Sequence, residues 1–224
     1  MENRAIIIEY LLHYCHKDSA KALLKEMKML DSCSDSIQNN DIQRTTNDSF
    51  KEDNIDWKQV EARKEVYEFI KKGDIQQAFI LINRHFPSLT SSTSNKETDF
   101  IIYKLYCQQF IEILRTSGAL EAIEFARCHL RPYREVYSEY TNSILCLIAY
   151  TDLEHERIKH IMSQEHRDDI ADQVNQLLLE AQGLPQQTTL EKLWRQSKVV
   201  ENELKNRQQG LLKKKDNNKD CQYK

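Results

Sequence analysis

The chain contains few of the residues that make tight turns: among its 224 residues are four glycines and three prolines. This scarcity is typical of a helical chain with short connections, and no segment shows the alternating pattern of a strand. The net charge is only -3 although 30% of the residues are charged, so the overall balance implies neither a nucleic acid nor a membrane as a partner. The longest apolar run, Ile144 to Tyr150, is far too short to span a bilayer, and we find no targeting segment.

Signatures of catalysis and metal binding are also missing. The sequence has no glycine-rich phosphate loop, no GxSxG elbow and no HExxH pair. His155 and His160 are five residues apart, which places them about 140° apart around a helix, whereas zinc ligands on a helix are three or four apart. His166 lies further along the chain. We therefore expect no enzymatic activity, no cofactor and no metal; an enzyme stays open as a third hypothesis, which bound metal in the purified chain would revive.

The six cysteines lack CxxC spacing, and several fall inside apolar helical patterns. This distribution favours buried, reduced thiols in a cytosolic or nuclear protein over a disulfide or zinc site. Cys128 is expected to face the core, which makes Cys128-His129 a weak nucleophile pair.

Residues 3–30 predict a helical hairpin in which Asp18 or Ser19 caps the second helix. Each helix carries an apolar stripe at helical spacing. The stripes comprise Ile6, Ile7, Tyr10, Leu11 and Tyr14 in the first helix and Ala20, Leu23, Leu24 and Met27 in the second. So short a hairpin has more apolar surface than it can cover, so we expect it to pack on another copy or another subunit; docking on its own chain is the alternative.

Two segments depart from the apolar helical pattern. Residues 31–56 carry seven acidic and two basic residues with few apolar ones, which predicts a flexible acidic linker or a phosphorylation segment. Residues 205–224 carry seven basic and two acidic residues, which leaves 1–204 at about -8. We expect this basic tail to be disordered and solvated; a nuclear-localisation or RNA contact is the alternative.

Between these segments the pattern predicts successive helices of an all-α, antiparallel bundle or solenoid. Gly73 suits a left-handed helix stop, Asp74 suits the cap of the next helix, and a polar loop follows at 88–99. The helix predicted at 100–116 is too apolar to lie on a surface, so we expect a central place with other helices on more than one side. Its stripe comprises Tyr103, Tyr106, Phe110, Ile113 and Leu114. Apolar residues after Pro185, among them Leu190, Leu193, Trp194 and Val199-Val200, are most simply core.

Two sets of residues match known patterns. In the hairpin they are Tyr10-Leu11, Tyr14, Ser19-Ala20, Leu23 and Glu26. This set resembles the LisH motif, a small helical dimerisation module, which usually has Gly and an aromatic residue where this chain has Cys15 and His16. The second set lies further along the chain and comprises Arg63, Gly73-Asp74-Ile75, Ala78, Leu81-Ile82-Asn83, Phe86-Pro87, Leu105, 107–112 and 122–127. This set resembles the CTLH domain, and Leu147 to Tyr150 resemble an element of the CRA region that follows it.

The resemblance implies five segments: a LisH-like hairpin at 3–30, the acidic linker at 31–56, a CTLH-like domain at 57–132, a CRA-like region at 133–204 and the basic tail at 205–224. LisH, CTLH and CRA in that order resemble subunits of the GID/CTLH E3 ubiquitin-ligase complex. Two kinds of member are similar: a short scaffold subunit, and a Ran-binding one that places a SPRY domain first. Catalytic subunits of such complexes end in a RING-type zinc domain, and this chain lacks a cysteine and histidine array at its C-terminus.

The resemblance therefore implies a non-catalytic scaffold that holds RING-bearing subunits and a substrate receptor together, in the cytoplasm and nucleus. The alternative is a Ran-pathway or microtubule-associated adaptor acting outside a ligase. For partner contact we assign Ile6, Tyr10, Leu11, Tyr14 and Leu23 in the hairpin and Gln108, Glu112 and Arg115 in the central helix. Phe110 and Leu114 are assigned to the core. The polar side chains of the central helix have an alternative role, which is hydrogen bonding between helices of the same chain.

Overall fold

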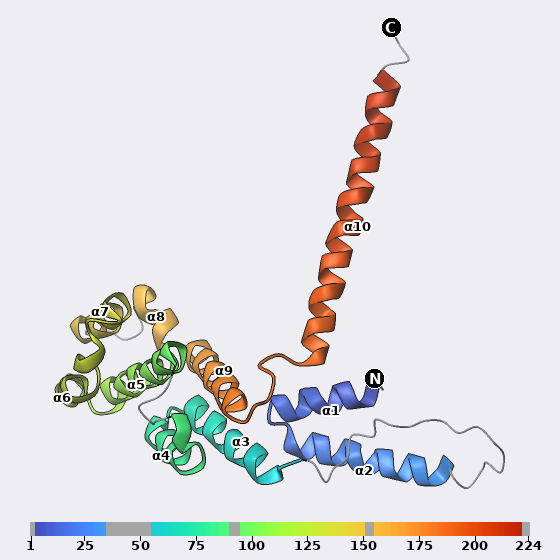
Figure 1. Ribbon diagram of the computed structural model, residues 1–224. Helices are drawn as coiled ribbons and strands as arrows, with labels where there is room; N and C mark the ends of the chain where they lie inside the picture. Colours follow the sequence, from blue (N-terminus) through green and yellow to red (C-terminus); the bar gives the residue numbers. More distant parts are fainter. Residues whose placement is uncertain (1–2, 35–54, 90–94, 151–154, 221–224) are drawn as a thin grey trace. The chain divides into compact units, whose positions relative to one another are not determined.

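The computed structural model describes residues 3–34, 55–89, 95–150 and 155–220, with 31–34 and 208–220 described as backbone only. Every regular element in these ranges is a helix (Figure 1), which confirms the all-α class. The chain forms two compact units. Unit 1 comprises Met1–Tyr14, Asp18–Glu52 and Gln187–Lys224, and unit 2 comprises Cys15–Lys17 and Asp53–Gln186. Within the described ranges, no helix has the combined length and apolar character needed to cross a bilayer.

Unit 1 contains α1 (Asn3–His13), most of α2 (Lys17–Ser34) and α10 (Thr189–Asp220). The first two helices are those expected of a hairpin, and α1 contacts α10 within the unit. Of the predicted acidic linker, residues 31–34 belong to α2, and residues 35–54 lie outside the described residues.

The C-terminal tail differs from the prediction. Residues 205–220 were expected to be disordered, but α10 continues through them to Asp220. Apart from Gly210, this stretch contains many good helix formers such as Lys, Leu, Gln and Arg, and it contains no proline. Local propensity therefore permits a helix where the apolar pattern gives no sign of one.

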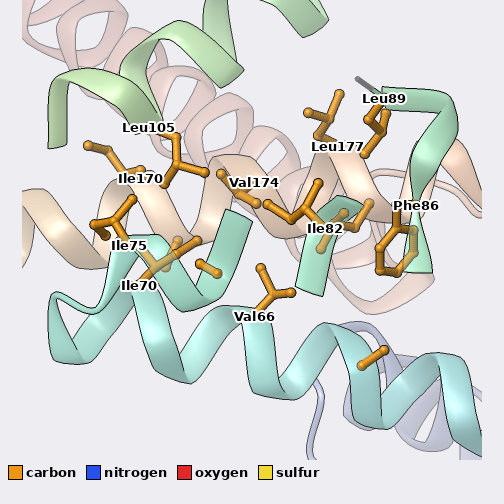
Figure 2. Close-up of a cluster of buried hydrophobic side chains, with 14 residues drawn as sticks. Val66, Ile70, Ile75, Ile82, Phe86, Leu89, Leu105, Ile170, Val174 and Leu177 are labelled. Carbon is orange, nitrogen blue, oxygen red and sulfur yellow. The ribbon is translucent and has the colours of Figure 1, made fainter. Parts of the chain in front are cut away.

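In unit 2, α3 (Trp57–Lys72), α4 (Ile75–His85), α5 (Lys96–Thr116) and α9 (Gln164–Ala181) surround the first apolar cluster. Helix α9 packs against both α3 and α5, so a C-terminal segment completes a core begun more than 90 residues earlier. Figure 2 shows the facing side chains of this cluster, which also receives Leu89 from the short 3₁₀ helix η2 (Pro87–Leu89). They include Val66, Ile70, Ile75, Ile82, Leu105, Ile170, Val174 and Leu177.

A second cluster of unit 2 lies around the C-terminal half of α5. It involves α6 (Ala119–His129), η3 (Arg131–Tyr133), α7 (Ser138–Leu145), η4 (Cys146–Ala149) and α8 (Glu156–Met162). Tyr103 stacks on Tyr137 and shares a hydrogen bond of 2.5 Å with Thr141. The fully buried members include Tyr103, Cys107, Phe110, Ile111, Ala122, Leu130 and Leu147.

Helix α5 has the central place that its sequence predicts. It contributes Leu105 to the first cluster and Phe110 and Leu114 to the second, and it contacts α4, α6, α7 and α9. The assignment of Phe110 and Leu114 to the core is confirmed. The helix begins at Lys96, inside the predicted polar loop, because Glu97 and Asp99 place negative charge in its first turn.

The junction of α3 and α4 also follows the prediction. Gly73 is left-handed, with φ of +83°, and its N–H donates to Ile70 O at 3.0 Å while the N–H of Asp74 donates to Phe69 O at 2.9 Å. The Asp74 side chain accepts a hydrogen bond from Gln77 N at 3.3 Å and so caps α4. Two short-range signals therefore fix the turn between these helices.

Candidate interaction surfaces

The beginning of α10 is attached to α1 by side chains. Thr188 Oγ1 accepts a hydrogen bond from Glu191 N at 3.2 Å, and the Glu191 carboxylate accepts one from Thr188 N at 2.8 Å. This reciprocal pair is a capping box, which satisfies amides at the helix start. Glu9 of α1 accepts a hydrogen bond from Thr189 N at 3.1 Å, and the hydroxyl of Tyr14, the residue after α1, donates to Glu191.

These contacts set the protonation behaviour of Glu191. Partial burial alone would raise its pKa, but hydrogen bonds from the Tyr14 hydroxyl and from Thr188 outweigh that effect and lower the pKa from its ordinary 4.5. The junction of α1 and α10 therefore depends on an ionised carboxylate.

The hairpin residues assigned to partner contact are half-buried. This holds for Ile6, Tyr10, Leu11, Tyr14 and Leu23. Tyr14 is engaged by Glu191 of its own chain, whereas Ile7, next to Ile6 on α1, is exposed. Part of the apolar surface of the hairpin is thus covered within the chain, and the partner contact of these residues stays a prediction.

Among the described residues of unit 1, most of the exposed large apolar side chains lie on α10. Trp194 is 62% exposed and Val200 57% exposed, and four neighbours on the helix are also exposed. The set on one side of the helix, called here the α10 apolar face, is Leu190, Leu193, Trp194, Val200 and Leu204; Val199 is also exposed but lies on the other side. The sequence analysis assigned all of these exposed residues except Leu204 to the core, and that assignment is wrong. Helical spacing shows that a face is apolar, but it does not show whether the covering atoms belong to the same chain.

The polar residues of α5 meet α9 inside unit 2. Glu112 accepts two hydrogen bonds from Arg167, Nε to Oε1 at 2.7 Å and Nη2 to Oε2 at 2.6 Å. Gln108 Nε2 donates to Glu112 Oε1 at 2.6 Å, and Arg115 Nη2 donates to Met162 O at 2.6 Å. The hydrogen bonds to Glu112 raise the pKa of Arg167, because they favour the charged guanidinium.

This arrangement differs from the expectation that these α5 residues face a partner. Gln108 is 1% exposed and Glu112 8% exposed, so neither side chain offers a contact surface. Arg115 is half-buried. Glu112 instead has the alternative role, in which hydrogen bonds between helices set the packing register, and Gln108 hydrogen-bonds to it from within α5.

A second buried polar cluster joins α3, α9 and the turn before α2. Arg63 is 1% exposed and donates from Nη1 to Asn175 Oδ1 at 3.0 Å and to Cys15 Sγ at 3.5 Å. Burial lowers the pKa of Arg63 and raises the pKa of the Cys15 thiol, although the nearby guanidinium acts in the opposite direction on the thiol. Cys15 itself is left-handed, with φ of 58°, a conformation that glycine adopts more easily.

The remaining chemical groups form no site in the described ranges. No group of three or more His, Cys, Asp or Glu there could hold a metal ion. His155 is exposed and caps α8 by accepting a hydrogen bond from Arg157 N at 3.2 Å, and burial lowers the pKa of the half-buried His166. Cys15 and Cys107 are buried, but Cys128 is exposed, contrary to expectation, because α6 buries fully only Ala122.

Comparison with known proteins gives the family. Residues 59–205 match the CTLH/CRA C-terminal to LisH motif domain. The chain is 23% identical over 147 residues to a Ran-binding protein M homolog of Arabidopsis thaliana, covering 61% of this chain and 31% of that protein. It is 28% identical over 148 residues to Protein FYV10 of Chaetomium globosum, covering 65% of this chain and 27% of that protein.

A third relative is the Glucose-induced degradation protein 8 homolog of Nematostella vectensis, which is 24% identical over 123 residues, 54% of this chain and 52% of the relative. The chain thus spans about a quarter to a half of the length of the curated relatives that it matches. The matched range runs through the predicted CTLH-like and CRA-like regions without dividing them, so their boundary stays a prediction. Because the match covers well over half of its residues, this chain belongs to the family of the CTLH/CRA C-terminal to LisH motif domain.

Proposed function

We propose that the chain is a non-catalytic scaffold subunit of a multi-subunit RING-type E3 ubiquitin ligase. It would hold RING-bearing subunits and a substrate receptor in one assembly, so that substrates are ubiquitinated and degraded. Family membership supports this role, and one relative carries glucose-induced degradation in its name. The proposed sites of action are the cytoplasm and the nucleus.

The observation that carries the proposal is the α10 apolar face. Its five large apolar side chains lie on one side of a helix and are exposed to solvent, which a monomer in isolation rarely maintains. The capping box and the contacts from Glu9 and Tyr14 fix the start of this helix, so the face is held on a defined element. Such a face fits the contact with a sister subunit better than it fits catalysis.

The proposed mechanism is positional. A scaffold that binds two proteins turns the encounter between them into an intramolecular event, and the effective concentration reaches about the millimolar range when the geometry permits. The scaffold needs no catalytic group for this effect. What it needs is at least two surfaces that different subunits can occupy together.

The test is affinity purification of the tagged chain from its native cells, followed by mass spectrometry. Leu193→Glu with Val200→Glu places two charges on the α10 apolar face, and we expect loss of RING-bearing CTLH subunits from the purified material. The matched control is Asn202→Glu with Asn206→Glu, two exposed positions on the other side of the same helix. Normal recovery of those subunits with the first variant contradicts the proposal.

The second candidate function is an adaptor in the Ran pathway or on microtubules, acting outside a ligase. It is favoured by the match to a relative named as a Ran-binding protein M homolog. The same purification separates the two functions. Ran-pathway or cytoskeletal proteins without any RING-bearing CTLH subunit would favour the adaptor.

A further inference from the structure

Unit 2 has a surface groove between α3 and α4, on the αα-hairpin closed by Gly73. The groove has a volume of about 330 Å³ and is lined by Glu65, Glu68, Phe69, Lys72, Gln77 and Leu81. The lining residues of α3, at positions 65, 68, 69 and 72, have the i, i+3, i+4, i+7 spacing of one helix face, and the two of α4 are four apart.

The groove has an apolar base and a charged edge. Phe69 and Leu81 are half-buried and pack against the first apolar cluster, whereas Glu65, Glu68, Lys72 and Gln77 are exposed. Lys72 Nζ lies 3.6 Å from a carboxylate oxygen of Glu68. Glu65 makes no ion pair with any residue of the described ranges, so the edge keeps an excess of negative charge.

We propose that this groove binds a short peptide segment of a partner protein that combines an apolar side chain with neighbouring lysine or arginine residues. The apolar side chain would contact Phe69 and Leu81, and the basic residues would pair with Glu65 and Glu68. Recognition of an apolar anchor with flanking charges is a common way for helical surfaces to bind peptides.

The charge at the edge of the groove and the volume of the groove both favour this kind of occupant. Anionic ligands, including phosphates, nucleic acids and acidic membrane surfaces, meet two carboxylates at the edge and are repelled. The volume lies at the small end of the range for ligand sites, about 300 to 1,000 Å³, so the groove accommodates one or two side chains and no folded domain. Binding through so small a surface is weak, with Kd roughly micromolar or higher.

The site is separate from the α10 apolar face, which belongs to unit 1, and it does not depend on the proposed scaffold role. If a ligase subunit carries the segment, the groove adds a contact to the assembly. If another protein carries it, the groove adds a partner.

The experiment measures fluorescence polarisation of a labelled twelve-residue peptide with two leucines flanked by lysines, titrated with the full chain. We expect saturable binding that is lost when glutamates replace the lysines or serines replace the leucines. The variant Glu65→Lys with Glu68→Lys should weaken binding about tenfold, because two attractive charge pairs become repulsive. Both positions are exposed, so the variant should fold.

The matched control is Glu121→Lys with Glu124→Lys. These two glutamates are also exposed and three residues apart on a helix of unit 2, but they do not line the groove. The control should change the affinity by less than about twofold. Equal effects of the two variants, undiminished binding of the serine peptide, or no saturable binding to the unmodified chain would overturn the proposal. Amide chemical shifts in an NMR titration should change at α3 and α4; changes confined to other helices would also overturn it.

Discussion

Asn175 of α9 accepts a hydrogen bond of 3.0 Å from the guanidinium of Arg63 on α3, and both side chains are buried. The two residues are 112 positions apart in the chain, so the bond joins the first long helix of unit 2 to the helix that completes its core. A buried cation needs polar acceptors because water no longer solvates it. The pair therefore fixes how α3 and α9 meet.

Replacing Asn175 with alanine should destabilise unit 2. We expect the free energy of unfolding to fall by about 1.5 to 3 kcal/mol, the range for a buried hydrogen bond to a charged group. Urea denaturation followed by circular dichroism measures the change. Asn83→Ala, at an exposed position of α4, should stay within about 0.5 kcal/mol. Similar losses for both variants would show that the Arg63 contact contributes little.

Replacing Gly73 with alanine should cost more than the same change at Gly183. Both glycines are left-handed, with φ of +83° and +70°, and both end a helix with the same hydrogen-bond pattern. A Cβ at Gly73 would lie 3.0 Å from Glu112 Oε2 and 3.2 Å from Arg167 Nη2, whereas at Gly183 it would meet nothing within 4 Å. Gly183→Ala should therefore show backbone strain alone, about 1 to 2 kcal/mol.

Gly73→Ala should add the displacement of the Glu112 and Arg167 side chains, and we expect at least about 1 kcal/mol beyond the Gly183 variant. Thermal unfolding of the two purified variants gives the comparison. Equal losses would mean that the ion pair moves aside without cost.

The junction of α1 and α10 should weaken in acid. The folded-state pKa of Glu191 is lowered from 4.5, so its ionised form contributes stability above about that pH, and the contribution is lost as the pH falls through the folded-state value. Tyr14→Phe removes one of the hydrogen bonds that lower the pKa. The variant should be about 1 kcal/mol less stable at pH 7.

As the pH falls through the lowered folded-state pKa of Glu191, the difference between wild type and Tyr14→Phe should shrink, because the carboxylate becomes protonated. Hydrogen exchange of the first turn of α10, followed against pH, measures the local effect. Tyr10→Phe, in the last turns of α1, serves as the control and should show no such pH dependence. A Tyr14→Phe difference that persists unchanged in acid would contradict the assigned role of Glu191.

The cysteines should differ in reactivity. Burial raises the pKa of Cys107 to about 12 and also raises that of Cys15, so both thiols are protonated and shielded near neutral pH. Cys128 and Cys146 are exposed. Of these four cysteines, iodoacetamide at pH 8 should label only the exposed pair in the native chain and all four after unfolding, as followed by peptide-resolved mass spectrometry. Native labelling of Cys107 as fast as that of Cys128 would contradict the described burial.

Local signals were the most predictable part of the fold. The Gly73 stop and the Asp74 cap depend on neighbouring backbone groups only, so residue type and order were enough to predict them. The central place of α5 was also predictable, since apolar residues around more than one side of a helix require several packing partners.

Contacts between distant residues were not predictable in the same way. Nothing in the sequence indicates that Arg167 would meet Glu112, or that Asn175 would meet Arg63, because these pairs depend on how α9 returns to the core. For the same reason the groove on α3 and α4 became visible only with the packing of those helices. For the α10 apolar face, the apolar pattern could be recognised in the sequence, but the exposure of its side chains could not.

For a partner that binds along α10, the length of the helix sets the distance to the partner, and the rotation of the helix sets the direction in which the partner lies. The helix runs 32 residues from Thr189 to Asp220, which at about 1.5 Å per residue is close to 48 Å. Removing seven residues would shorten it by about 10 Å while turning the remainder by only about 20°, because seven residues make nearly two whole turns. Removing two would shorten it by about 3 Å but turn the remainder by about 160°. Changes in the length of α10 can therefore alter the distance to a bound partner and the partner's angular position around the helix axis independently of one another.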